Sequence, residues 1–233
     1  MAHYNPHEYV VERVAGGEEF SAFVDFVRSG PIRRYKRGRY FCQAVDEHDY
    51  VLVDLLGKTD GFLGNKAVKI PLPGSLKKYE KLMRNVGMGK YADELILTMN
   101  RAAEAAVPEA KKLFVDAIKK MSLKDAKGIL TGGQTSGTEY FKRTTSAQLR
   151  EKFLPIVKSA TAKVQLAETY NEYAQKGAQF GLVSKENANL DEYVTQKALD
   201  GLFYMVAEEE KKIRQNPLQA GSDIAKKVFG LMK

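Results

Sequence analysis

Two groups of polar side chains stand at spacings that could support acid–base chemistry or ligand binding. In the segment MNRAAEAAVPEAK, Asn100 and Arg101 precede Glu104, and in VTQKALDGLF, Lys197 precedes Asp200 by three residues. Side chains three apart meet on one face of a helix. Glu104 could act as a general base beside Arg101 and Asn100, and Lys197 could act with Asp200. These five residues form the candidate binding cleft, but the sequence assigns a catalytic role to none of them.

The Arg101 and Glu104 pair also has a plainer interpretation. Pro108 removes a helical hydrogen bond and clashes with the carbonyl of residue 104, so it bends or breaks the helix there. The two charges would then form a solvated ion pair beside a turn, worth about 0–1 kcal/mol. The enzymatic alternative, a hydrolase- or lyase-type reaction using carboxylate and lysine chemistry, requires both polar groups to converge in one cleft. Both interpretations stay open at the level of sequence.

Other kinds of chemistry are excluded by composition. Residues 57–233 contain no histidine, cysteine or tryptophan, which removes a Ser-His-Asp triad, a cysteine nucleophile and a zinc site built from thiolates or imidazoles from that part. The segment GGQTSGT at 132–138 lacks the lysine of a phosphate loop and is predicted to join two helices. Neither a metal nor a cofactor is predicted from the first part, whose imidazoles and thiol match no ligand spacing: His3, His7, His48 and Cys42.

A basic stretch, RSGPIRRYKRGRYF at 28–41, could bind nucleic acid. Its arginines would contact phosphates while its aromatic side chains stack on bases. The alternative is a solvated basic loop balanced by nearby acidic residues, and we rank nucleic-acid binding behind it. The arginines concerned are Arg33, Arg34, Arg37 and Arg39.

The chain changes composition near residue 56. Residues 1–56 hold six arginines and one lysine, whereas residues 57–233 hold five arginines and twenty-five lysines. Residues 1–56 carry seven basic and nine acidic side chains and residues 57–233 thirty and twenty, so the positive charge of the chain, +8 overall, lies in the second part. We interpret the chain as an N-terminal segment, 1–56, followed by a helical domain, 57–233. No stretch reaches the roughly 18 apolar residues of a membrane span, and no export signal is visible at the start.

Hydrophobic periodicity predicts an all-α fold, a compact multi-helix bundle, from residue 57 onward. In the N-terminal segment we expect a short helix over 18–28 and a small β-hairpin pairing 39–45 with 50–56. Capping patterns at Ser122 and Asn189 open two of the later helices. The predicted helices are 75–86, 90–121 with a break at Pro108, 123–132, 145–164 with Pro155 inside, 165–179, 190–215 and 222–232.

Two features of the predicted helices bear on packing. Alanines recur with Met99 on one face of the 90–121 segment, which suits close contact with a neighbouring helix. Gly201 in mid-helix costs about 1 kcal/mol relative to alanine, so it predicts a close backbone approach or a cleft wall. The run Glu208-Glu209-Glu210, followed by two lysines, is predicted to be a solvated face with internal ion pairs.

Eight sequence motifs, which follow one another in a fixed order, resemble those of the bacterial family known as domain of unknown function 4197. They are LGKTDGFLGN, KIPLPG, GMGKYADEL, MNRAAEAAVPEAK, DAIKKMSLKDAKGIL, FLPIVK, YVTQKALDGLF and AEEEKKIRQNP. The resemblance covers about residues 55–233 and implies a compact helical domain. Because members of the family usually begin with an export signal, it also implies the periplasm or cell envelope. The chain differs from the family at its start. Family members usually have an export signal and an amphipathic helix that leads into LGKTDGFLGN, and we expect neither of them in this sequence.

These observations favour a non-enzymatic, envelope-associated helical protein. We expect it to bind a small apolar or amphipathic ligand, or a protein partner. The enzymatic alternative and nucleic-acid binding through 28–41 rank second and third. A fully packed interior without a pocket would count against the small-ligand version.

Overall fold

The computed structural model describes residues 52–179 and 188–215, and its regular structure in these ranges is entirely helical. The predicted all-α class is therefore confirmed for the described part of the chain. Residues 52–57 form a first helical stretch. The labelled elements are α4 (Gly74–Asn85), α5 (Gly89–Ala106), the 3-10 turn η1 (Val107–Glu109), α6 (Ala110–Lys119), α7 (Leu123–Thr131), α8 (Ser136–Thr161), α9 (Gln165–Gln179) and α10 (Leu190–Gln215).

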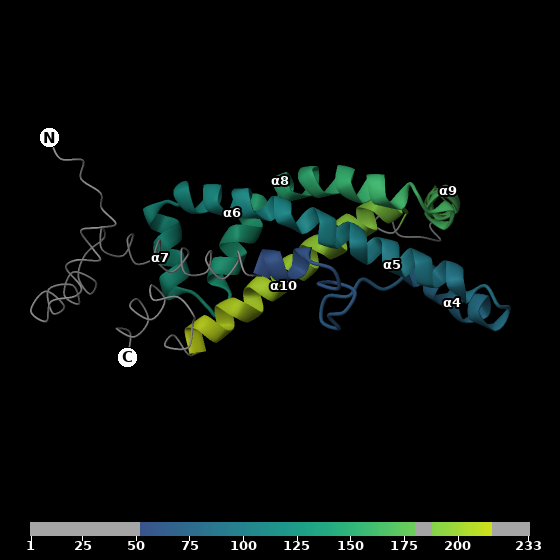
Figure 1. The fold of residues 1–233 in the computed structure, drawn as a ribbon. Helices are drawn as coiled ribbons and strands as arrows, with labels where there is room; N and C mark the ends of the chain where they lie inside the picture. The colour runs from purple at the N-terminus through teal and green to yellow at the C-terminus, as the bar shows by residue number, and fades with distance from the viewer. Residues whose placement is uncertain (1–51, 180–187, 216–233) are drawn as a thin grey trace, which may run out of the picture.

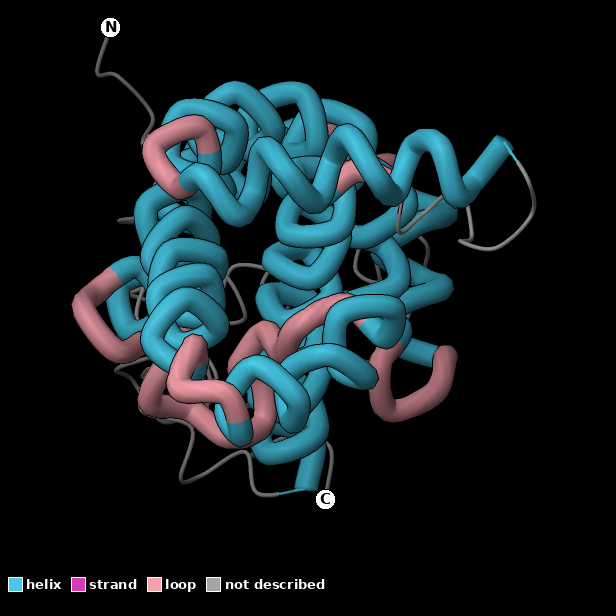
Figure 2. Tube along the Cα trace, turned by 90° about the vertical axis from the view of Figure 1, so that its right-hand side faces the viewer, coloured by secondary structure: helices cyan, strands magenta, loops and turns pink. Residues whose placement is uncertain are grey.

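Three long helices build the centre of the bundle. Helix α8 packs on α5 and on α10, and α10 also contacts α5 as it runs obliquely across the molecule (Figure 1). Helices α6 and α7 pack on α8 at one end, and α4 packs on α5 at the other. Figure 2, viewed from the end that carries α4 and α9, shows helices joined by loops throughout the described residues. The core lies where α5, α8 and α10 meet.

The predicted break at Pro108 is confirmed. Helix α5 ends at Ala106, the 3-10 turn carries Pro108 in its first positions, and α6 begins at Ala110. Met99 and the alanines on its face, among them Ala102 and Ala106, are fully buried. Alanine side chains are short, so two helices can approach each other closely where alanines lie between them. This face of α5 therefore packs tightly against α8.

Helix starts that depend on a local cap were predicted well. Ser122 and Asp125 form a complete capping box at the start of α7. At the start of α10, the Asn189 side chain accepts the N–H groups of Asp191 and Glu192 at 2.8 and 3.2 Å. Glu192 itself pairs with Arg150 on α8. The predicted Asn189 cap is thus present, while the carboxylate of Glu192 joins two helices.

The predicted start of α8 at Thr145 is wrong. The helix begins at Ser136, and Thr145 is buried in its middle. The Thr145 hydroxyl donates to the carbonyl of Phe141 at 2.7 Å, so it bonds within the helix instead of capping one. Pro155 does lie inside α8, as predicted.

The second strand of the predicted hairpin is also wrong. Residues 52–57 are helical, and Leu52, Val53 and Leu56 are buried at helical spacing. This stretch leads directly into LGKTDGFLGN, so the expectation that no amphipathic helix precedes that word is wrong as well. The first strand, 39–45, and the predicted helices 18–28 and 222–232 lie outside the described residues.

The loop over residues 58–73 lies between α5 and α10. Its Phe62 and Val68 side chains are buried against Gly201 of α10. A Cβ atom at Gly201 would stand 2.8 Å from Cε1 of Phe62 and 3.2 Å from Cβ of Val68. The predicted close approach at Gly201 is therefore present, and the approaching group is this loop.

Gly201→Ala is expected to lower the free energy of unfolding by about 1–3 kcal/mol, because the new methyl group overpacks a filled core. Gly128, in the exposed part of α7, is a matched control, since a Cβ atom there would meet nothing within 4 Å. Gly128→Ala should instead stabilise the protein by about 0.5–1 kcal/mol through helix propensity. Urea unfolding of both variants measures the contrast, and equal stabilisation by both would contradict the packing described for Gly201.

Candidate functional site

The structure divides the five predicted cleft residues into two groups. Asn100, Arg101 and Glu104 of α5 bind the 58–73 loop through their side chains. Lys197 and Asp200 of α10 line a surface hollow on that loop. Ile70 lies between the groups, because its backbone bonds to Asn100 while the residue lines the hollow.

Asn100 is fully buried, and its side-chain amide forms hydrogen bonds with backbone groups of the loop and of α5. Its Oδ1 accepts the Ile70 N–H at 2.8 Å, and its Nδ2 donates to the Ile70 carbonyl at 2.9 Å. Nδ2 also donates to the carbonyl of Ile96 at 2.8 Å. The side chain thus pairs with Ile70 as a neighbouring β-strand would, and it holds the extended KIPLP stretch against α5.

Glu104 is 3% exposed, and three donors surround its carboxylate. Oε1 accepts the backbone N–H groups of Phe62 and Leu63 at 3.0 and 3.1 Å, and Oε2 accepts Arg101 at 2.6 Å. Arg101 also donates to Asp60 at 2.8 Å, and the bonds to Glu104 and then to Asp60 raise its pKa. The carboxylate is therefore not solvated, and its oxygens are occupied by the loop and by the guanidinium.

A second buried carboxylate, Glu210, was missed in the sequence. Its Oε1 accepts the Gly137 N–H at 2.9 Å, and its Oε2 accepts both the N–H and the hydroxyl of Thr138 at 2.7 Å. Arg214 donates two further bonds to Oε1, at 2.9 and 2.7 Å. Glu210 thus binds the first turn of α8, where free N–H groups favour a negative charge.

The prediction of a solvated Glu208-Glu209-Glu210 face is therefore wrong for Glu210, which is fully buried. It is right for its neighbours, because Glu208 pairs with Lys211 and Glu209 with Lys212. A sequence signal was available. Glu210 stands four residues after Val206 and three before Ile213, both buried, so it occupies the apolar face of α10.

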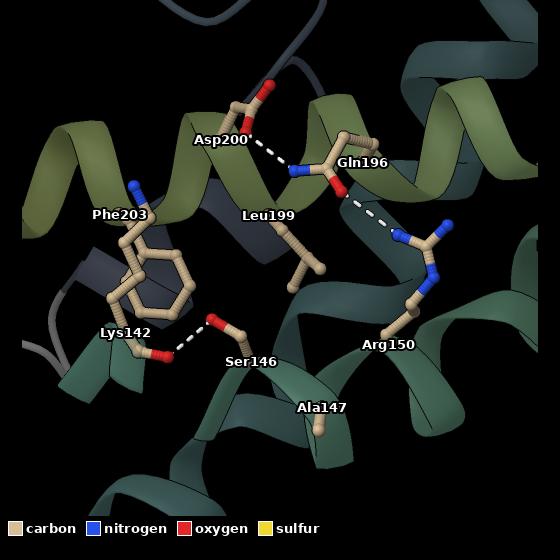
Figure 3. Close-up of a pocket in the computed structure, with 8 residues that line it drawn as sticks. All are labelled: Lys142, Ser146, Ala147, Arg150, Gln196, Leu199, Asp200 and Phe203. Atoms are coloured by element: carbon tan, nitrogen blue, oxygen red, sulfur yellow. Dashed lines mark hydrogen bonds between the residues drawn. The ribbon is translucent and has the colours of Figure 1, made fainter. Parts of the chain in front are cut away.

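Two hollows lie along the middle of α10, on either side of Asp200. The smaller, about 200 Å³, is lined by α8 and α10 residues that include Lys142, Arg150 and Phe203 (Figure 3). Gln196 crosses its rim, since it accepts from Arg150 and donates to Asp200, both at 2.9 Å. Asp200 contributes to both hollows.

The larger hollow, about 330 Å³, lies between α10 and residues 67–71 of the loop. Its α10 wall carries Lys197, Asp200 and Tyr204. Lys197 Nζ lies 3.6 Å from the Asp200 carboxylate and 5.9 Å from the centre of the Tyr193 ring. Among the two hollows, this one is lined by both Lys197 and Asp200, the candidate cleft residues that lie at the surface.

Tyr193 secures the same loop from the α10 side. Its hydroxyl donates to the Pro71 carbonyl at 3.0 Å, and burial, followed by the neighbouring Tyr170, raises its pKa to about 12. The phenol therefore stays protonated at neutral pH and serves as a donor to the loop. Within the ranges the structure describes, no three His, Cys, Asp or Glu side chains gather at a distance suited to a metal ion.

The sequence motifs LGKTDGFLGN and KIPLPG form most of the loop that Asn100, Glu104 and Tyr193 hold in place. A family model described as "Protein of unknown function (DUF4197)" matches residues 48–230. The chain belongs to the DUF4197 family. The match includes the helical stretch 52–57 and leaves residues 1–47 outside. No curated protein and no solved structure matches this DUF4197 chain.

In this DUF4197 protein, none of the helices in the described ranges combines the length and apolar character needed to cross a bilayer. The basic arginines of 28–41 lie outside the described residues. Among the predicted site residues, Asn100, Arg101 and Glu104 thus meet at the buried loop, while Lys197 and Asp200 meet at the surface.

Proposed function

We propose that this DUF4197 protein is a non-enzymatic binding protein of the bacterial cell envelope. Its partner is another protein, which places an acidic segment over the two hollows of α10. The observation that carries the non-enzymatic part is the state of the buried carboxylates. Glu104 and Glu210 accept hydrogen bonds from backbone N–H groups and arginines, so they are occupied in holding the fold.

The surface of the hollows supports a protein partner over a small apolar ligand. Small-molecule sites are usually enclosed and lined mainly by apolar side chains, with volumes of about 300–1,000 Å³. Here one hollow, about 200 Å³, is smaller than that range and the other, about 330 Å³, lies at its lower end, and both are open to solvent with charged side chains on their walls. The fully buried aromatic side chains Phe62, Phe114, Phe141 and Phe153 pack in the core and line neither hollow.

The charges favour an acidic segment. The two hollows are lined by four basic side chains and by one carboxylate, that of Asp200. Opposite charges on two protein surfaces increase the rate and specificity of association. The exposed Tyr204, at the edge of the larger hollow, offers an aromatic contact of the kind enriched in interfaces. The four basic residues are Lys69, Lys142, Arg150 and Lys197.

Mass spectrometry under native and denaturing conditions is the first test. We expect the same chain mass in both, because a protein partner that binds through a solvated surface separates during purification. A discrete small mass lost on denaturation would overturn the choice of a protein partner and would identify a ligand class. The envelope location rests on the family resemblance, and fractionation of the native cells against a periplasmic marker tests it.

Site-specific photo-cross-linking tests the surface itself. A photoreactive phenylalanine at Tyr204 is expected to capture one defined protein in the native cells, whereas the same group at the exposed Lys124 of α7 should not. The variant Lys69→Glu/Lys197→Glu should reduce the Tyr204 product by about tenfold or more, because like charges oppose an acidic partner. Equal capture from both positions, or no effect of the charge reversal, would contradict the proposal.

A further inference from the structure

The turn between α4 and α5 exposes an apolar tip. Four large apolar side chains lie within ten residues of chain, and each is at least 40% exposed. They are Leu82 (58%), Val86 (60%), Met88 (47%) and Tyr91 (40%). Three other large apolar side chains reach such exposure among the described residues, and they are separate in sequence. Single exposed apolar residues are ordinary, but a group of four on one turn indicates an interaction site.

The tip is a well-defined helical hairpin at one end of the molecule. Figure 1 places the α4–α5 turn at the end opposite α7. On α4, Leu76 and Met83 pack on the core at a spacing of seven residues, which leaves Leu82 outside. Arg84 donates to Glu80 of the same helix and to Asp93 of α5, so it joins the two helices beside the turn. The apolar side chains are therefore held outward by a defined helical hairpin.

Basic residues outnumber acidic ones along the hairpin that forms the tip. Residues 74–90 carry five basic side chains and one acidic side chain. Arg84 pairs with Glu80 and with Asp93, the next carboxylate along α5, while Lys77, Lys81 and Lys90 are exposed. Glu94 on α5 is also exposed, so three exposed lysines stand against one exposed carboxylate outside the Arg84 ion pairs.

A group of exposed apolar side chains on a hairpin that also carries exposed lysines suits the surface of an anionic bilayer. Apolar side chains enter the boundary between headgroups and acyl chains, and lysines contact the lipid phosphates. A stable protein–protein interface, by contrast, uses about 20–30 residues on each side, far more than one turn supplies. The charge and the small size of the apolar group thus both favour a lipid surface over a second copy of the chain.

We propose that the α4–α5 turn docks this protein onto anionic phospholipid. Leu82, Val86, Met88 and Tyr91 enter the interface, and Lys77, Lys81 and Lys90 lie at the level of the phosphates. The contact is peripheral and reversible, because four side chains cannot replace a spanning helix. It uses a different surface from the α10 hollows, so it does not depend on the function proposed for them.

Flotation with lipid vesicles tests the contact on the full chain. The protein should float with phosphatidylcholine vesicles that contain about one-third phosphatidylglycerol, and less with phosphatidylcholine alone, with salt weakening the difference. Val86→Asp/Met88→Asp should bind about tenfold or more weakly, since two apolar side chains no longer enter the interface. Leu97→Asp is the matched control, because Leu97 is similarly exposed on α5 outside the tip, and it should bind as the unmodified chain does.

A fluorescent reporter separates this contact from other routes to the membrane. The chain has no tryptophan, so Met88→Trp and Leu97→Trp each introduce a single indole. On anionic vesicles the emission of the Met88→Trp variant should shift to the blue, and that of the Leu97→Trp variant should not. The arginines of 28–41 could also bind anionic lipid. Replacing all five of them by glutamine should leave the shift of the Met88→Trp variant in place; they are Arg28, Arg33, Arg34, Arg37 and Arg39.

Three results would overturn the proposal. The first is equal binding by the Val86→Asp/Met88→Asp variant and the unmodified chain. The second is an unshifted emission from the Met88→Trp variant when the protein floats, which would place the contact elsewhere. The third is a dimer in sedimentation equilibrium that the double aspartate variant dissociates, which would make the tip an interface between copies. Thermal melting of each variant checks that the fold is retained, as the exposure of these side chains predicts.

Discussion

Glu210→Ala is expected to lower the free energy of unfolding by about 3–5 kcal/mol, the usual loss when one partner of a buried charge pair is removed. The carboxylate accepts five hydrogen bonds, from Gly137, Thr138 and Arg214. Without it, two backbone N–H groups at the start of α8 lose their acceptor inside the protein, and Arg214, 16% exposed at its side chain, loses its carboxylate. A buried N–H group that loses its acceptor costs free energy, whereas Arg214 still donates to the carbonyl of Ile129.

Glu208→Ala is the matched control for this experiment. Glu208 lies on the same helix two residues earlier, but it is partly exposed and pairs with Lys211 at the surface. Its removal should change the free energy of unfolding by about 0–1 kcal/mol. Urea unfolding followed by circular dichroism compares the two variants. If both lose the same small amount, the Glu210 carboxylate does not stabilise the first turn of α8.

Glu104→Ala should have a loss of similar size, about 3–5 kcal/mol. The substitution leaves the N–H groups of Phe62 and Leu63 without their acceptor and removes one of the two carboxylates that bind Arg101, the other being Asp60. Glu104→Gln should lose less, about 1–3 kcal/mol, because one oxygen remains to bond either the loop or the guanidinium. The graded series therefore distinguishes loss of the carboxylate from loss of the side chain.

Glu94→Ala serves as the control, because Glu94 is exposed on the same helix, and we expect about 0–0.5 kcal/mol for it. Hydrogen exchange adds a local readout, since the amides of Phe62 and Leu63 should exchange faster in Glu104→Ala than in Glu94→Ala. Unchanged protection of these two amides would show that the carboxylate does not hold the loop.

Local features of the fold were predictable because their causes are local. The Ser122 capping box, the Asn189 cap and the break at Pro108 each depend on residues within a few positions. The start of α8 was not predictable in this way. Its first turn is completed by Glu210, more than 70 residues away, whereas Thr145 merely has the composition of a cap.

The candidate site shows the same division. The spacing of Arg101 and Glu104 predicted their contact, which the structure contains at 2.6 Å. It could not predict that the 58–73 loop would cover the carboxylate, because loop placement depends on packing against α10. Gly201 predicted part of this arrangement. A glycine in the middle of a helix indicates that another segment packs closely against it, but it does not show which segment that is.

The position of the 58–73 loop has a consequence for the order in which the protein acquires its structure during synthesis. The loop leaves the ribosome early, but one of its two walls is α10, whose residues are added more than 100 positions later. Until then, Phe62 and Val68 lack the surface that covers them, and the first turn of α8 lacks its carboxylate. Contacts of such long sequence separation form slowly, and incomplete chains expose apolar surface. Nascent chains that end before residue 190 should therefore depend on chaperones.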